Sequence, residues 1–286
     1  MRPYRFEPVG EIWRDGALVP ATEVTVAATD PAVQSGIGVF ETLAVRDEVA
    51  LDVPEHLERL AAGAARLEIA LGDHDALAHG IRSVAAAVPA GNGWLKILAL
   101  RGSSTIVFGG TMDLTEEGRE VSAVLLPYRQ SAFDPLAGLK TTNYAGRILA
   151  LSEAQRAGAD EGIWLNSRGH LAEGCTSSVF VVRGRRIFTP SLSDGILPGV
   201  VRAIVLRAAQ ELGIIVHEGK IRLEKLERAE EAFLTSSLRG VRPLIKFEGR
   251  PVGRGATGPT TRRIAEAVQQ IRTRHSRVIQ TPMEGA

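Results

Sequence analysis

Residues 162–213 read GIWLNSRGHLAEGCTSSVFVVRGRRIFTPSLSDGILPGVVRAIVLRAAQELG, which is three short apolar runs followed by one longer periodic segment. The runs GIWLN, SVFVV and RIFT have the length and composition of strands. The segment after them has apolar residues at intervals of three and four, which predicts a helix with one buried stripe from about Val200 to Leu212. The stripe consists of Val201, Ile204, Val205, Ala208 and Leu212. Gly213 ends this helix.

The segments on either side continue this mixture of strands and helices. A helix is predicted before the region, from Tyr144 to Ala157, and a last helix after it, through Ile264, Val268 and Ile271. The runs IIVHE, AFLTS and RPLIKF add three strands between them. Because strands and helices do not alternate strictly, the pattern predicts a mixed α+β fold.

The first third of the chain predicts two hairpins and two helices. Asp15 and Gly16 form the turn of a compact hairpin within EIWRDGALV. A second hairpin joins strands at Val39 to Val45 and Val49 to Val53. Apolar residues at helical spacing then predict one helix around residues 57–64 and another around residues 77–88, which Pro89 stops.

Two more strands are predicted at Trp94 to Leu100 and Val121 to Tyr128, with a glycine-rich polar stretch between them. The segment after Tyr128, RQSAFDPLAG, is polar and has no clear period. We therefore predict a first domain over residues 1–127, an interdomain connection over residues 128–138 and a second domain over residues 139–286.

Composition excludes several functional classes. The chain has 286 residues and a formal net charge of +1, so it has no basic field to hold a nucleic acid. No stretch approaches the roughly 18 apolar residues of a membrane span, and we expect no membrane role. Cys175 is the single cysteine, which excludes an internal disulfide, and we expect a reduced cytoplasmic protein with this thiol buried.

Common catalytic motifs are missing or occur in the wrong context. GRGATG at residues 253–258 matches the dinucleotide-binding glycine pattern, but one helix and a tail are all that follow it, so we interpret it as a chance match. His74 and His79 lack the glutamate of a zinc motif, and no metal site is predicted. No nucleophile elbow or phosphate-binding lysine loop occurs.

Six strings, in this order, resemble those of the fold type IV enzymes that depend on pyridoxal 5'-phosphate (PLP), a group that includes the class IV aminotransferases and 4-amino-4-deoxychorismate lyase. The strings are GIGVFETLAV (36–45), EHLERL (55–60), GLKTTNYAG (138–146), LAEGCTSSVF (171–180), TPSLSDGILPGVVR (189–202) and AEEAFLTSSLRGVRP (229–243). The resemblance implies a two-domain aminotransferase architecture, with a small α/β domain and a larger domain with a β-barrel-like core. It also implies a homodimer.

The resemblance assigns roles around the cofactor ring. Lys140 corresponds to the lysine that forms the Schiff base and then transfers a proton, a role that requires a reactive amine. Glu173 corresponds to the acid that keeps the pyridine nitrogen protonated, so that the ring can accept electrons. Tyr144 resembles the tyrosine that many members place near the ring hydroxyl.

The phosphate group is expected at the start of the helix that follows Pro198 and Gly199. There the free amides of Val200 and Val201 would bind an anion. Arg59, in EHLERL, matches the family arginine that pairs with the phosphate. The family usually has threonine at the position of Val201, and we expect a hydroxyl of Ser236 or Ser237 to compensate.

Some sequence features favour a transaminase and others favour the lyase. Two residues separate Lys140 from Asn143, as in D-amino-acid transaminases and the lyases, whereas branched-chain aminotransferases typically have three. PLAGLK and SSLRG favour the lyase, while Tyr144 is typical of transaminases. We expect a transaminase acting on an amino acid and a 2-oxo acid, of the D-amino-acid type rather than the branched-chain type. The alternative is the lyase, which releases pyruvate and 4-aminobenzoate.

Substrate contacts are harder to assign. Arg101 is the candidate for gripping the substrate carboxylate, because it is the one cation in the region of RGSSTIVFGG. The resemblance adds Phe40, Ser237 and Leu238 as substrate-binding candidates.

Overall fold

A computed structural model describes residues 8, 10–113 and 116–280. The chain divides into two compact units. The N-terminal unit contains residues 10–113, 139–144 and 272–280, and the C-terminal unit contains residues 116–138 and 145–271. Relative to the expected domains, residues 116–127 group with the C-terminal unit and residues 139–144 with the N-terminal unit. The domain boundaries themselves stay a prediction.

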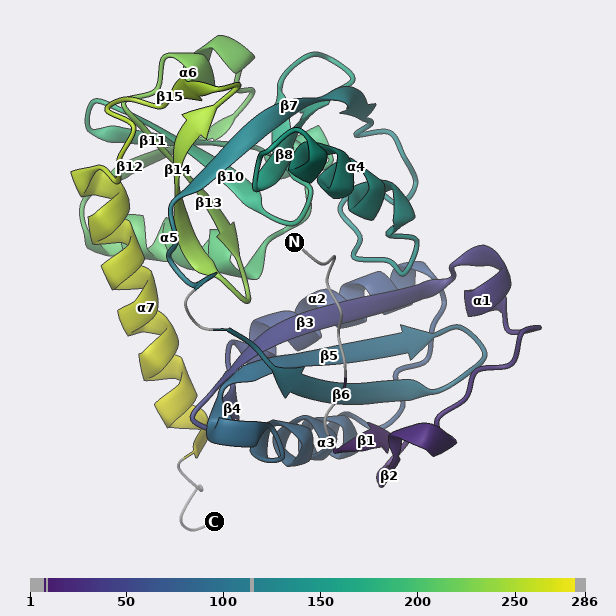
Figure 1. Ribbon diagram of the computed structural model, residues 1–286. Helices are drawn as coiled ribbons and strands as arrows, with labels where there is room; N and C mark the ends of the chain where they lie inside the picture. The colour runs from purple at the N-terminus through teal and green to yellow at the C-terminus, as the bar shows by residue number, and fades with distance from the viewer. Residues whose placement is uncertain (1–7, 9, 114–115, 281–286) are drawn as a thin grey trace. The chain divides into compact units, whose positions relative to one another are not determined.

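The N-terminal unit is built on an antiparallel sheet that has six strands within the described residues, in the order β2-β1-β6-β5-β3-β4 (Figure 1). The strands are β1 (Glu11–Arg14), β2 (Ala17–Pro20), β3 (Gly38–Arg46), β4 (Val49–Ala50), β5 (Gly93–Leu100) and β6 (Thr105–Thr111). The helices are α1 (Pro31–Ser35), α2 (Val53–Arg66) and α3 (His74–Ala86), with short 3-10 turns η1 (Ala21–Glu23) and η2 (Pro89–Gly91).

Alternation along β3 gives the sheet two chemically different faces. Val39, Leu43 and Val45 point to one face and join α2 and α3 in the apolar core of the unit. Leu60 of α2 and Ile81 of α3 are buried in the same core. Phe40 and Thr42 therefore point to the opposite face of the sheet, away from the two helices.

The C-terminal unit contains a larger mixed sheet, with nine strands among the residues described, in the order β12-β11-β10-β13-β14-β7-β8-β9 and with β15 beside β14. Its strands are β7 (Val121–Gln130), β8 (Glu161–Asn166), β9 (Leu171–Gly174), β10 (Ser178–Arg183), β11 (Arg186–Pro190), β12 (Ile215–Gly219), β13 (Glu231–Ser236), β14 (Gly240–Phe247) and β15 (Arg250–Pro251). Parallel pairs join β11 to β12, β14 to β7 and β7 to β8, and the other pairs are antiparallel.

The helices of this unit are α4 (Ala145–Arg156), α5 (Val200–Glu211), α6 (Leu223–Glu227) and α7 (Pro259–Gln280), and the 3-10 turn η4 (Leu192–Asp194) precedes α5. Residues 272–280 of α7 group with the N-terminal unit. The buried stripe of α5 packs with Ile264, Val268 and Ile271 of α7 in one core, as the sequence periodicity predicts. Phe180 and Phe233 stack in that core with ring centroids 4.8 Å apart. The prediction of a mixed α+β fold is confirmed.

Three predicted elements differ from the structure. The strand predicted at Val49 to Val53 is wrong beyond Ala50, because Asp52 adopts a left-handed conformation and α2 begins at Val53. The glycine-rich stretch before Val121 contains a strand, β6, that the prediction misses. β7 continues to Gln130, so the first three residues of the expected connection belong to the sheet.

Within the described part of the chain, no helix is both long enough and apolar enough to cross a membrane.

Candidate active site

Lys140 lies in a short segment that is fastened to β3 by backbone hydrogen bonds. Phe40 N donates to Lys140 O at 3.0 Å, and Thr142 N donates to Gly38 O at 2.8 Å. An isolated antiparallel bridge pairs Val39 with Thr141. The backbone on both sides of Lys140 is therefore held beside the first residues of β3, Gly38 to Phe40.

The amine of Lys140 lies among aromatic rings. Its Nζ is 4.4 Å from the centroid of the Phe40 ring and 5.3 Å from that of Tyr144. The two rings meet edge to face with centroids 5.2 Å apart. The structure therefore brings together three residues that the sequence analysis singles out, Lys140, Phe40 and Tyr144, all in the N-terminal unit.

A second amine approaches the same ring. Lys96 Nζ on β5 is 4.6 Å from the Phe40 centroid. Burial lowers the pKa of Lys96. Lys96 is not among the predicted site residues, although its β5 position, opposite Thr42 in register, puts it on the Phe40 face of the sheet.

Arg59 belongs to a buried charged cluster on the helix-facing side of the sheet. Its Nε and Nη2 donate to the two carboxylate oxygens of Glu41, each at 2.7 Å. His56 Nδ1 lies 2.6 Å from Glu41 Oε2. Burial alone would raise the pKa of Glu41, but the charges and hydrogen bonds of Arg59 and His56 outweigh it and lower the pKa to about 2.

The pKa of His56 shifts in the direction that burial favours. Removal from water lowers the pKa of His56, although the neighbouring Glu41 charge partly opposes the shift. The imidazole is therefore neutral at physiological pH, with its Nδ1 hydrogen directed at Glu41. This bidentate and buried arrangement fixes the direction of the Arg59 guanidinium.

Arg101 is placed differently from the other candidates. Its Nη2 pairs with Glu68 Oε2 at 2.8 Å, and its side chain is 43% exposed. The backbone of Arg101 is tied to the sheet by a bond from its N to Ile37 O at 3.1 Å. Its role toward a substrate carboxylate stays a prediction.

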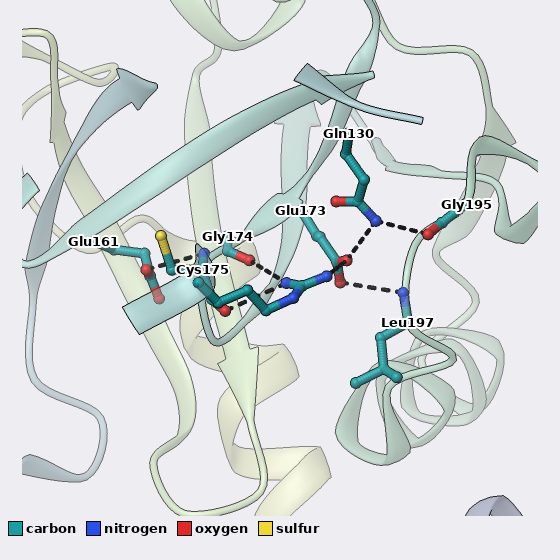
Figure 2. A network of polar contacts seen from close by, with 8 residues as sticks. Gln130, Glu161, Glu173, Gly174, Cys175, Gly195 and Leu197 are labelled. Atoms are coloured by element: carbon teal, nitrogen blue, oxygen red, sulfur yellow. Dashed lines mark hydrogen bonds and ion pairs between the residues drawn. The ribbon is translucent and has the colours of Figure 1, made fainter. Parts of the chain in front are cut away.

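Glu173 is the centre of a polar network in the C-terminal unit (Figure 2). Its side chain is 3% exposed at the end of β9, which agrees with the inward direction expected of it. Arg147 Nη2 donates to Oε1 at 2.5 Å, and Gln130 Nε2 donates to the same oxygen at 3.0 Å. Leu197 N donates to Oε2 at 3.2 Å. Gln130 also donates to Gly195 O, so the network reaches the loop ahead of α5.

The start of α5 has the features of an anion site. Among the described residues, no side chain caps this helix, whose N-cap is Gly199. A Cβ on Gly199 would come within 2.7 Å of Ser178 Oγ, so only glycine allows this close approach. The side chains of Val200 and Val201 are buried in the apolar core, and their backbone amides belong to the first turn, where N–H groups have no acceptor within the helix.

The remaining candidates follow β13. Ser236 ends the strand, and Ser237 and Leu238 form the turn to β14, where all three are half-buried. Thr235 of β13 pairs in register with Ser178 of β10, the residue whose hydroxyl lies close to Gly199. The end of β13 that carries Ser236 is therefore next to the part of β10 that approaches the start of α5. These three residues lie in the C-terminal unit with Glu173, Val200 and Val201.

The sequence analysis misses the groups that hold Glu173. Gln130 falls in the predicted connection, and Arg147 is one of many polar residues in a predicted helix. Both contact Glu173 from more than 25 positions away along the chain. The sequence carries no local signal for either contact, because Gln130 comes two residues after the predicted strand, in a polar segment without a clear period.

The described residues contain no cluster of histidine, cysteine and acidic side chains able to hold a metal ion. The chemistry available at these positions is that of an amine among aromatic rings, a buried carboxylate held by cations and amides, and a helix start open to an anion. Each of these groups, taken within its own unit, is of a kind that a phosphorylated aldehyde with a basic ring nitrogen would need.

Comparisons with known proteins agree with that donor set. A family model described as amino-transferase class IV matches residues 38–247. The putative branched-chain-amino-acid aminotransferase of Methanocaldococcus jannaschii is 27% identical over 281 residues, covering 92% of this chain and 97% of that protein.

Solved structures extend the likeness to three dimensions. The branched-chain aminotransferase of Thermoproteus uzoniensis with norvaline has a TM-score of 0.83 at 28% identity and covers 91% of this chain and 94% of that one. The T.th. branched-chain amino acid aminotransferase with pyridoxamine 5'-phosphate has a TM-score of 0.86 at 25% identity and covers 95% and 96%. Because the family model matches well over half of its length, this chain belongs to the class IV amino-transferases.

Proposed function

We propose that this protein is a PLP-dependent transaminase that moves an amino group between an amino acid and a 2-oxo acid. The observation that carries the proposal is the Lys140 amine, fixed by β3 and lying beside the Phe40 ring. Two further findings support it: the chain is a class IV amino-transferase, and a similar enzyme has been solved with pyridoxamine 5'-phosphate.

The residues present account for each part of the cofactor. Lys140 would bind the aldehyde group, and Tyr144, whose ring centroid is 5.3 Å from the Lys140 amine, would lie on the ring-hydroxyl side of the cofactor. Glu173 would accept a hydrogen bond from the ring nitrogen. The amides of Val200 and Val201 and a hydroxyl of Ser236 or Ser237 would hold the phosphate, and Arg59 is the cation that the family resemblance assigns to it.

Bound PLP supplies an electron-poor ring that stabilises negative charge on the carbon next to the substrate nitrogen. The chain supplies the proton transfers. The Nζ of Lys140, as a free amine, would take the proton from that carbon and return it. Phe40 and Tyr144 limit the directions in which its Nζ can move. Phe40, Arg101, Ser237 and Leu238 are the proposed contacts to the rest of the substrate.

Branched-chain amino acids are the substrate class that we propose, because the relatives and structures named above are branched-chain aminotransferases. The expected D-amino-acid preference and the lyase alternative receive no support from these comparisons. The spacing of two residues between Lys140 and Asn143 is the sequence feature that distinguishes this chain from typical branched-chain enzymes. A homodimer in the cytoplasm is the proposed state of the enzyme, from the same family resemblance.

Borohydride reduction tests the covalent step. The reduced adduct is expected on a peptide containing Lys140, as found by mass spectrometry, and the Lys140→Ala variant should form none. Lys96→Ala is the matched control, since it removes the other amine at the Phe40 ring and should leave the adduct in place. An adduct on Lys96 in the parent protein would contradict the assignment.

A substrate panel tests the reaction. Leucine, isoleucine and valine should convert bound cofactor to its aminated form, followed by absorbance, and 2-oxoglutarate should restore it. D-Alanine and D-glutamate are included in the panel to test for D-amino-acid transaminase activity. Release of pyruvate from aminodeoxychorismate without any oxo acid would support the lyase and overturn the proposal.

A further inference from the structure

The carboxylate of Glu173 has a permanent cationic partner that the proposed reaction does not require. Arg147 lies in the first turn of α4, and its Nη2 forms an ion pair with Glu173 Oε1. Its Nη1 donates to Gly174 O at 3.4 Å and to Cys175 O at 3.3 Å. The guanidinium therefore spans the carboxylate and the two carbonyls that follow it.

The turn after Glu173 is fixed from its other side as well. Glu161, buried on β8, accepts a hydrogen bond from Cys175 N at 3.1 Å (Figure 2). It also accepts hydrogen bonds from Thr176 Oγ1 at 2.9 Å and Ser177 Oγ at 3.0 Å. Because the turn is held by a carboxylate on one side and by Arg147 on the other, the ion pair to Glu173 is a fixed part of the fold and not a mobile surface contact.

The two oxygens of Glu173 are used unequally. Oε1 accepts from both Arg147 and Gln130, whereas Oε2 accepts from the amide of Leu197. A carboxylate offers about four lone-pair positions, two on each oxygen. One lone pair of Oε2 is therefore the position that these three bonds leave for another donor, such as the N–H of a cofactor ring.

A cation fixed on a carboxylate weakens the negative potential that the carboxylate presents elsewhere. Two unit charges about 6 Å apart still interact appreciably at the effective dielectric constant of a partly buried site. The Arg147 side chain is 25% exposed and that of Glu173 is 3% exposed, so solvent screens this pair only in part. The other carboxylates of the region have partners of their own, Glu161 in the turn and Asp194 with Asn166 Nδ2 at 2.9 Å.

We propose that Arg147 is a positioning residue that sets the proton affinity of the cofactor ring nitrogen through Glu173. By occupying Oε1, it directs Oε2 toward the ring, and its charge makes the ring nitrogen release its proton more readily than an unpaired carboxylate would allow. The inference rests on the proposed function, because it assigns the ring nitrogen of PLP to Glu173.

Nitrogen NMR of the holoenzyme reconstituted with PLP labelled at the ring nitrogen tests this inference, because the ¹⁵N shift reports directly whether that nitrogen carries a proton. In Arg147→Gln, the ring nitrogen should keep its proton to a pH about one unit higher than in the parent protein. Arg147→Lys keeps the charge and should resemble the parent. If Arg147→Gln does not fold, Arg147→Met removes the charge in its place.

Two matched variants separate charge from structure. Gln130→Ala removes the neutral donor to Glu173 Oε1. It should shift the titration midpoint of the ring nitrogen by less than the loss of Arg147 does. Arg119→Gln breaks another partly buried ion pair of the same unit, that of Arg119 with Asp160 at 2.7 Å, and should leave the nitrogen midpoint unchanged.

The outcomes distinguish this inference from the proposed function. The inference alone is overturned if the ring nitrogen titrates with the same midpoint in the parent protein and in Arg147→Gln while both carry the reduced adduct on Lys140. A lower melting temperature of the variant would not change that conclusion. Absence of the Lys140 adduct in the parent protein overturns both.

Discussion

At the scale of single residues, the surroundings of Cys175 make its thiol unreactive. Its side chain is fully buried, and burial, together with the nearby charge of Glu161, raises the pKa of the thiol to about 12. The thiolate that attacks disulfide reagents is therefore scarce in the folded protein. We expect no reaction with 5,5'-dithiobis(2-nitrobenzoate) at pH 8 until denaturant is added. Stoichiometric reaction of the native protein within minutes would contradict this environment.

The residue assignments that can be made from sequence are those carried by compact strings. Glu173 is buried and turned inward, as the short strand HLAE predicts, and Lys140 lies beside Phe40 and Tyr144. Arg147, Gln130 and Lys96 cannot be predicted in this way. Each acquires its surroundings from a segment far away along the chain, and no local spacing records such a contact.

At the scale of elements, Gly80 decides how closely α3 packs on the N-terminal sheet. A Cβ at this position would overlap the ring of Trp13 on β1, which is itself almost fully buried. Alanine would improve helix propensity by about 1 kcal/mol. The overlap with a large, enclosed ring costs more, so we expect Gly80→Ala to lower the free energy of unfolding by about 1–3 kcal/mol.

Gly146 on α4 provides the control for this substitution. A Cβ there meets no atom within 4 Å among the described residues. Urea unfolding of Gly146→Ala should therefore show a stability within about 1 kcal/mol of the parent. Equal effects of the two alanines would show that α3 can move away from Trp13.

Elements with a strong period are predictable, and those shaped by glycine are not. The predicted helices α4, α5 and α7 are confirmed, and α5 and α7 follow apolar repeats. The prediction misses β6 because Gly109 and Gly110 interrupt its apolar pattern. The structure explains these glycines: a Cβ on Gly109 would crowd Trp94 O at 2.9 Å and Val84 Cγ1 at 3.2 Å, so the residue permits α3 to lie close to the strand.

At the scale of the whole molecule, chain order and spatial grouping differ. Residues 139–144 follow the predicted boundary but group with the N-terminal unit, because Lys140 O and Thr142 N bond to β3. The polar composition of the preceding segment predicts a connection, yet composition carries no information about which sheet a returning segment joins.

One ion pair joins positions 220 residues apart within the N-terminal unit. Arg272 Nε on α7 donates to Asp52 Oδ2 at 2.7 Å, and both side chains are at most 5% exposed. Removing one partner leaves a buried charge uncompensated, so we expect Arg272→Ala to reduce the free energy of unfolding by about 3–5 kcal/mol. Arg101→Ala, which breaks the exposed pair with Glu68, should cost at most about 1 kcal/mol. Comparable losses in urea titrations of the two variants would contradict the buried character of the Asp52 pair.

The buried cluster of Glu41, His56 and Arg59 makes stability depend on pH in a defined direction. The pKa of Glu41 is about 2 in the folded protein against an ordinary value of 4.5, so its contribution is complete above pH 4.5 and is lost as the pH falls toward 2. The full shift corresponds to about 3 kcal/mol. Burial lowers the pKa of His56 below 6.5, so the unfolded chain takes up its proton first and stability already declines as the pH falls below 6.5.

Fluorescence can follow this decline in the unit where it arises. Trp13 and Trp94 belong to the N-terminal unit and Trp164 to the C-terminal unit, so a Trp164→Phe background reports unfolding of the former alone. Urea titrations between pH 7.5 and 3 should show a falling unfolding free energy in two stages. In this background His56→Gln should flatten the stage below pH 6.5, and Glu41→Gln the stage below pH 4.5. Since each variant removes one titrating group, identical pH slopes in all three proteins would mean that the acid sensitivity arises elsewhere in the unit.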